Sequence, residues 1–411
     1  MKISTHKSVW FVFILSPILG AFLSLKHNKY KFSKNILWAF IVFYGFTFSI
    51  SGESSGSDIN RYVDELKVLH EKTFTFSEAI SYFKSTGEID ILRTIISITL
   101  SRFTNSQIAL TTVYAFIFGF FYSRNLFFLI DNLKEKWKYG VLFLMIVFSL
   151  IVPIWDINGF RMYTAAHLFI YGLLPYLFFG NKKYLWFCAF SPLVHFSFVL
   201  PVIVLFIYLL AGNHIHVYFI LFILSMIFPV LNLNWFNQNF ERYLPEVFID
   251  RTLGYRTENT VILYREGLGI GLQWYALWYG KALGYAIKAF IILFYFKHRT
   301  LIKSSQFVKA FAFALLFYSF ANVLNSLPSG GRFLSIANMI SMSVIIFFSQ
   351  NIGLKGLTRY LFYLSIPAFL LFIIISIRIG LYSISLTTVF GNPIIAIITI
   401  GNNISFNDLI K

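Results

Sequence analysis

Long apolar runs recur along the whole chain, and no other feature constrains its fold as strongly. A run of about 18 or more apolar residues is long enough to cross the hydrocarbon core of a bilayer as a helix. Only 12% of the 411 residues are charged, whereas a soluble domain carries about 25%. The sequence therefore predicts an all-α, polytopic integral membrane protein. The predicted spans are residues 8–25, 36–51, 106–123, 139–155, 160–180, 217–233, 272–296, 305–326, 331–350 and 359–377.

Together with segment 184–210 and the ambiguous segment 386–400, these spans predict about 10–12 transmembrane helices in a single domain, residues 1–411. The first run lacks a signal-peptide cleavage site, so we interpret it as a retained span. Cys188 is the only cysteine, which excludes a disulfide within the chain. We find no metal-ligand cluster, phosphate-binding loop or dinucleotide fingerprint, and the sequence predicts neither a metal nor another cofactor.

Basic residues gather in short connectors between the spans. This distribution indicates membrane topology rather than a nucleic-acid surface, although the net charge is +17. Connectors rich in lysine and arginine stay in the cytoplasm, which places the N-terminus and the loops 52–105, 155–160, 234–271 and 327–331 outside. The predicted cytoplasmic connectors are 26–34, 134–138, 181–183, 297–303 and 353–359.

Segment 184–210 has to turn back within the membrane if this topology is correct. Connector 181–183 is predicted inside and loop 234–271 outside, so only one full crossing fits between them. We therefore predict that 184–210 forms a broken or re-entrant hairpin. Pro192 and Pro201 are placed to break it, and His195 lies near its tip. Irregular backbone at membrane depth is tolerated where it lines a cavity.

Arginine is enriched on the predicted outer side, where the positive-inside rule does not explain it. Ten of the 13 arginines fall on outer loops or outer span ends. The planar guanidinium suits bidentate contact with phosphate or carboxylate. The distribution therefore predicts an anionic ligand on the outer face. These arginines are Arg61, Arg93, Arg102, Arg161, Arg242, Arg251, Arg256, Arg265, Arg332 and Arg378.

Two acid–arginine pairs stand out. Asp58, Arg61 and Tyr62 follow the second span, and Asp156 and Arg161 flank the start of the span at 160–180. Asp58 could equally be a helix N-cap, and Arg161 could simply extend to the lipid headgroups. Segment 88–103 predicts an amphipathic helix in the membrane interface, because Asp90, Arg93, Thr94, Ser97 and Ser101 lie opposite its apolar residues.

The remaining candidates each have a structural alternative. Tyr163 and His167 share a helix face, but His167 also suits a buried, hydrogen-bonded histidine. His195 could handle a proton or satisfy the broken backbone around it. Arg251 and Arg256 lie in the loop 237–267, which is rich in charged and aromatic residues, and Arg332 follows a Ser-Gly-Gly turn whose amides could bind an anion.

These motifs resemble those of the EpsG family of bacterial exopolysaccharide polymerases, which are similar to the Wzy O-antigen polymerases. The resemblance is carried by GSDINRY after the second span, by FRMYTAAHLF, by the basic connector, by PLVHFS and, less specifically, by SGGRF. It covers most of the chain through short motifs. Met162 departs from the family, in which Gln or Gly often follows the arginine.

The resemblance implies a glycosyltransferase that joins undecaprenyl-diphosphate-linked repeat units outside the bacterial cytoplasmic membrane without a metal. The implied catalytic residues are His195, Asp58 and Arg161. The implied binding residues are Arg61, Tyr62, Asp156, Tyr163, His167, Arg251, Arg256 and Arg332. Its partners would be the lipid-linked oligosaccharide, membrane lipids and a chain-length regulator, with no nucleic acid. The alternatives are a flippase or transporter for the same lipid, and an outer-face ligase or acyltransferase.

Overall fold

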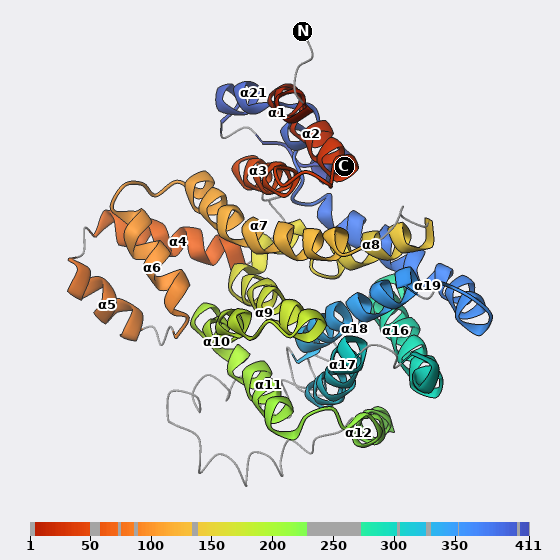
Figure 1. The fold of residues 1–411 in the computed structure, drawn as a ribbon. Helices are drawn as coiled ribbons and strands as arrows, with labels where there is room; N and C mark the ends of the chain where they lie inside the picture. Colours follow the sequence, from red (N-terminus) through yellow and green to blue (C-terminus); the bar gives the residue numbers. More distant parts are fainter. Residues whose placement is uncertain are drawn as a thin grey trace.

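The computed structural model describes residues 5–49, 58–72, 75–85, 89–133, 139–227, 273–301, 305–325, 330–351, 353–400 and 403–410. Within these ranges all regular structure is helical, apart from an isolated bridge between Ser385 and Ser405. The predicted all-α class is confirmed. The bundle groups α1–α3 and α21 on one side and α10–α12 on the opposite side (Figure 1).

Six helical segments of the described part of the chain are long and apolar enough to cross a bilayer. Helix α7, for example, has 25 residues, a rise of about 37 Å, compared with a hydrocarbon core of about 30 Å. The chain is therefore an α-helical, polytopic membrane protein, as predicted. The segments comprise α7 (Gln107–Asp131), α8 (Tyr139–Ile151) with α9 (Phe160–Phe179), α16 (Trp274–Leu301), α17 (Ser305–Leu324), α18 (Gly331–Asn351) and α19 (Leu357–Gly380).

Helix α18 lies at the centre of the bundle and packs against α7, α8, α9, α16 and α17. Its buried face includes the small residues Ala337, Ser341 and Ser343. Small residues let helix backbones approach closely where lipid provides no hydrophobic driving force. Tight packing around α18 thus fixes the helices that position the site.

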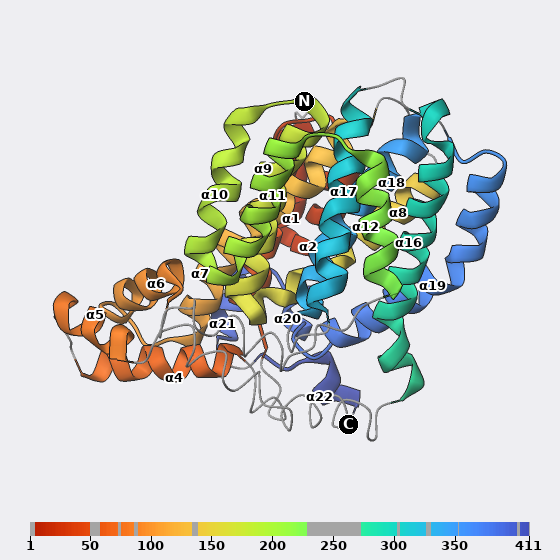
Figure 2. The ribbon, with the colours of Figure 1, turned by 90° about the horizontal axis from the view of Figure 1, so that it is seen from below.

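We name the two ends of the bundle after residues at the start of α9 and just beyond its end. The Arg161 end is where α9 begins, and the Lys182 end is where the chain leaves α9. The long helices run between these ends (Figure 2). Helices α4 (Asp58–Glu71), α5 (Phe76–Ser85) and α6 (Ile91–Ser101) form a layer at the Arg161 end. The predicted loop 52–105 is thus largely helical, and the predicted loop 234–271 lies outside the described residues.

The predicted first span, residues 8–25, is not one continuous helix. It divides at Ser16 into α1 (Thr5–Leu15) and α2 (Pro17–Lys26), because Pro17 starts a new helix well but cannot continue one. The two pieces fold against each other, and a Cβ on Gly20 would lie 2.7 Å from the Cα of Phe13. With rises of about 15 Å, neither crosses alone. Helix α3 (Ser33–Phe46) follows.

Segment 184–210 forms the predicted broken hairpin. Helix α10 (Leu185–Val194) runs antiparallel to α9, and Cys188 packs against Gly172. The turn His195–Phe198 reaches the start of α9, where the Ser197 hydroxyl contacts Met162. Helix α11 (Val199–Ala211) returns, and Tyr208 donates a hydrogen bond to the Lys309 carbonyl at the start of α17.

The hairpin breaks at His195, which has extended backbone (φ −148°, ψ 118°). Pro192 lies inside α10 and Pro201 in the first turn of α11, so the prolines flank the break. Helix α12 (Ile215–Ile227) then leads back toward the Arg161 end.

The C-terminal segment resolves the ambiguity over residues 386–400. Helices α20 (Leu386–Phe390), α21 (Pro393–Ile398) and α22 (Phe406–Ile410) have five or six residues each, too few to cross the membrane. The segment packs on the end of α3, where the hydroxyls of Thr47 and Thr388 are 2.7 Å apart.

Candidate functional site

Arg161 is positioned by a break between α8 and α9. Helix α8 ends at Ile151, just before Pro153, and a short 3₁₀ helix, η1 (Ile154–Gly159), redirects the chain before α9 begins. The backbone N–H of Asp156 donates to the Pro153 carbonyl within this turn. Gly159 packs against the ring of Tyr163, where a Cβ would come within 2.8 Å of ring atoms. This turn places Arg161 in the first turn of α9.

The Arg161 guanidinium joins three elements of the fold. Its Nη1 lies 3.0 Å from Asp90 Oδ2, and its Nε donates to the Tyr62 hydroxyl at 2.7 Å. The other oxygen of Asp90 accepts the backbone N–H of Phe196 at 2.9 Å. Asp90 is buried, with a side chain 1% exposed. Arg161 and Asp90 therefore connect α4 and α6 with the tip of the broken hairpin.

This arrangement corrects one expectation. Closeness in the sequence pairs Arg161 with Asp156, but the ion pair of Arg161 is with Asp90. The sequence pattern places Asp90 only on the polar face of an interfacial helix. The spacing of Asp90 and Arg93 on one helix face was the available signal, but nothing in the sequence indicated which helix that face would meet.

Tyr62 lies among three guanidinium groups. The Cζ atoms of Arg61, Arg93 and Arg161 are 5.3, 4.8 and 5.3 Å from its ring centroid, within the range of cation–π attraction. Burial raises the pKa of the Tyr62 phenol, and the nearby arginines only partly oppose this. Tyr62 therefore stays neutral and accepts the hydrogen bond from Arg161.

Arg93 and Glu65 form a second, largely buried ion pair between α6 and α4. The Arg93 side chain is 3% exposed and that of Glu65 14%. Breaking a buried pair by removing one partner leaves an uncompensated charge, which costs about 3–5 kcal/mol. The pair therefore holds the α4–α6 layer together, and the sequence alone does not indicate that these two residues meet.

Asp58 and Arg61 pair at the surface of α4. Their charged groups are 3.0 Å apart, with side chains 36% and 61% exposed. The backbone N–H of Ile59 donates to Asn158 in η1 at 3.3 Å, which fixes the start of α4 beside the turn before α9. The two acid–arginine motifs of the sequence are thus adjacent in space.

Asp156, Tyr163 and Arg332 form a further group beside this pair. Tyr163 lies within electrostatic range of Asp156, Arg332 and Asp58. Asp156 is half-buried, and its carboxylate has no ion pair or hydrogen bond with any described residue. Arg332, in the first turn of α18, is exposed and likewise without a partner in the described part of the chain. An anion beside Arg332 would meet positive charge that no ion pair with a described carboxylate neutralises.

His195 caps the hairpin turn. Its Nδ1 accepts hydrogen bonds from the N–H of Ser197 at 3.3 Å and from the Ser197 hydroxyl at 3.2 Å. A backbone N–H can only donate, so Nδ1 is unprotonated and the neutral ring carries its proton on Nε2. In this tautomer His195 satisfies the broken backbone through Nδ1 and carries its N–H donor on Nε2.

His167 is placed in the core of the bundle, away from the charged groups. Its side chain is 2% exposed. Its Nε2 is 3.2 Å from the Val152 carbonyl, and its Nδ1 is 3.2 Å from the Asn125 amide nitrogen. Both ring nitrogens are therefore occupied, as the structural alternative for this histidine anticipated.

Arg251 and Arg256, predicted to bind substrate, lie outside the described residues. In the described ranges no group of three or more His, Cys, Asp or Glu side chains could hold a metal ion. Searches against protein-family models, curated proteins and solved structures found no match to this chain.

Proposed function

We propose that the protein is a polysaccharide polymerase that joins undecaprenyl-diphosphate-linked repeat units at the Arg161 end of the bundle. The observation that carries this proposal is a group of ionisable side chains at that end: Arg332 and Asp156, which have no ion pair with a described residue and lie within electrostatic range of Tyr163, and the exposed Arg61. A lipid-linked diphosphate sugar presents a dianionic leaving group beside an apolar tail. It therefore requires cationic side chains at the edge of a membrane bundle.

The arginines supply binding and leaving-group stabilisation. Arg332 and Arg61 bind the diphosphate and stabilise the charge that develops as the bond between the anomeric carbon and the diphosphate oxygen breaks. Arg161 already contacts Asp90 and Tyr62. In this proposal it positions α4, α6 and the hairpin tip, while the exposed arginines contact the substrate.

A carboxylate accepts the proton of the attacking sugar hydroxyl. His195 and Asp58 were the expected bases, but His195 accepts hydrogen bonds at Nδ1 and Asp58 is bonded to Arg61. The Asp156 carboxylate has no hydrogen bond or ion pair with a described residue, which favours Asp156 as the proton acceptor. The hydroxyl oxygen then bonds to the anomeric carbon, and the lipid diphosphate leaves with the electron pair of the broken bond.

Deleting the gene in the source bacterium and analysing the length of its surface polysaccharide tests this proposal. A polymerase predicts single repeat units in place of long chains. Loss of all exported units would instead indicate a flippase, and polymer that is made but not attached would indicate a ligase.

Arg332→Gln should fail to restore long chains to the deletion strain. A charge-assisted bond is worth about 1.5–3 kcal/mol, or roughly ten- to a hundredfold in rate if it acts in the transition state. Arg359→Gln is the matched control, because Arg359 is exposed at the Lys182 end. Equal chain lengths from both variants would remove Arg332 from the site.

A further inference from the structure

An open apolar groove runs along α3, away from the charged site. It has a volume of about 540 Å³ and lies between α3 and α7, with α1 and α21 as its other walls. Almost all of its lining is apolar, including Phe13, Trp38, Val42, Phe116 and Ile397. On a membrane protein, an apolar groove of this kind is suited to an acyl chain.

The length of the groove matches one leaflet. Its lining on α3 extends from Asn35 to Phe46, a rise of about 16 Å, which is half of the roughly 30 Å hydrocarbon core. The groove therefore fits a chain that enters from one surface and ends near the bilayer centre.

Arg124 marks the polar end of the groove. Its Nη2 donates to Asn35 Oδ1 at 2.7 Å, and its Cζ lies 4.9 Å from the ring centroid of Trp38. Both of these neighbours line the groove. Arg124 lies within a spanning helix, yet in the described ranges it has no carboxylate partner. A cationic side chain within a spanning helix is stabilised by an anionic partner.

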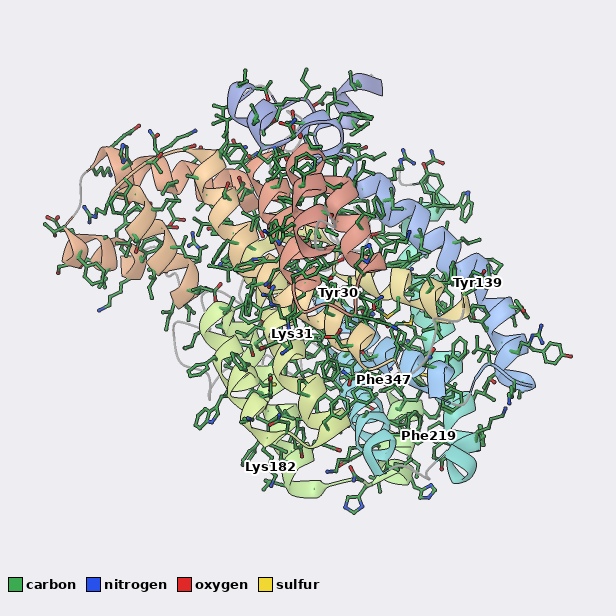
Figure 3. All side chains as sticks on the ribbon, turned by 45° about the horizontal axis from the view of Figure 1, so that its top comes forward. Tyr30, Lys31, Tyr139, Lys182, Phe219 and Phe347 are labelled. Carbon is green, nitrogen blue, oxygen red and sulfur yellow. The ribbon has the colours of Figure 1, made fainter. Side chains whose placement is uncertain are left out.

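The adjacent connector is also basic. Arg124 Nη1 is 3.5 Å from the carbonyl of Lys34 in the first turn of α3. The connector between α2 and α3 adds Lys29 and Lys31 and contains no acid. Figure 3 shows Tyr30 and Lys31 on this connector, separate from Lys182. Basic clusters at a membrane surface attract anionic lipid headgroups.

We propose that the groove binds one acyl chain of an anionic glycerophospholipid, whose phosphate contacts Arg124 and Lys34. The apolar walls select a hydrocarbon chain, and the unpaired guanidinium selects a negative headgroup. This lipid site is separate from the proposed polymerase site and does not depend on it.

Native mass spectrometry of the purified full-length protein tests the site, with phosphatidylglycerol and phosphatidylcholine as probes. We expect one phosphatidylglycerol to be retained more strongly than phosphatidylcholine. Arg124→Gln should weaken its retention by about ten- to a hundredfold. Ala39→Phe should weaken both lipids, because Ala39 lines the groove and a phenyl ring would fill it. Val42→Trp serves the same purpose if Ala39→Phe does not fold.

Lys182→Gln is the matched control, because it removes a cation that is exposed at the same end. It should leave retention unchanged. Equal retention of the two lipids, or an Arg124→Gln variant that binds like the wild type, would overturn the headgroup assignment. Groove-filling variants that fold and still retain lipid would overturn the chain assignment. Retention of a polyprenyl lipid in place of phospholipid would instead assign the groove to the tail of the proposed substrate.

Discussion

Arg161 makes two contacts from different nitrogens of one rigid, planar group. Nε reaches Tyr62 while Nη1 reaches Asp90. A lysine has a single ammonium group and cannot reproduce both directions. Loss of activity in Arg161→Lys would therefore be consistent with either a diphosphate clamp or a positioning role. A measurement of stability separates the two.

Arg161→Lys should lower the free energy of unfolding by about 1–3 kcal/mol, because one charge-assisted hydrogen bond is lost while the charge opposite Asp90 remains. Unfolding in mixed detergent micelles measures this. Arg61→Lys is the control, since the Arg61 side chain is 61% exposed and its ion pair contributes little. Unchanged stability with lost polymer would restore the clamp interpretation, and no change in either would leave Arg161 as an interfacial anchor.

At the scale of single elements, the sequence predicted the faces of helices better than their partners. The pattern of residues 88–103 correctly predicted an amphipathic helix, found as α6. Ile91 and Ile95 are exposed, as expected for lipid contact, while Arg93 and Ser97 are buried. Periodicity gives the two faces of a helix, but the burial of the polar face depends on α4, which is distant in sequence. The ion pairs of Asp90 and Arg93 could not be predicted for that reason.

The hairpin tip allows a sharper test of His195 than removal of its side chain. His195→Asn should keep the turn, because an Asn side-chain oxygen can accept the Ser197 N–H as an N-cap does. It removes the titratable ring. If His195 is only a cap, this variant should fold and restore normal chain length, whereas His195→Ala should destabilise the turn by about 0.5–2 kcal/mol.

Polysaccharide chain length in the complemented deletion strain, together with protein level in the membrane, gives the result. A well-folded Asn variant without polymer would return the proton-handling role to His195.

At the scale of the whole molecule, counting crossings predicted the architecture more accurately than hydropathy alone. Residues 184–210 are apolar enough to suggest crossings, but the charge of the flanking connectors required a hairpin, and the structure has one. Residues 8–25 are not flanked by basic connectors on both sides. The sequence therefore did not predict that the chain folds back at Ser16. Close packing of Gly20 on Phe13 is a tertiary contact that hydropathy does not report.

The orientation of the bundle is the last prediction. Single cysteines are introduced into a Cys188→Ala background, since Cys188 is buried and is the only native thiol. Asp64→Cys on α4 should react with an impermeant maleimide in intact cells, because the basic connectors 181–183 and 353–359, which are predicted to be cytoplasmic, lie at the opposite end of the bundle. Lys182→Cys, Asn213→Cys and Lys355→Cys should react only after permeabilisation.

Each departure from this pattern has a distinct meaning. Labelling of Lys182→Cys and Asn213→Cys from opposite sides would contradict the hairpin, because α10 and α11 would then make a single crossing between them instead of leading away from one side and back to it. Labelling of both from outside, with Asp64→Cys protected, would keep the fold but invert it. The group around Asp156 and Arg332 would then face the cytoplasm, where exported lipid-linked repeat units are not available, and the polymerase proposal would fail although the structure stood unchanged.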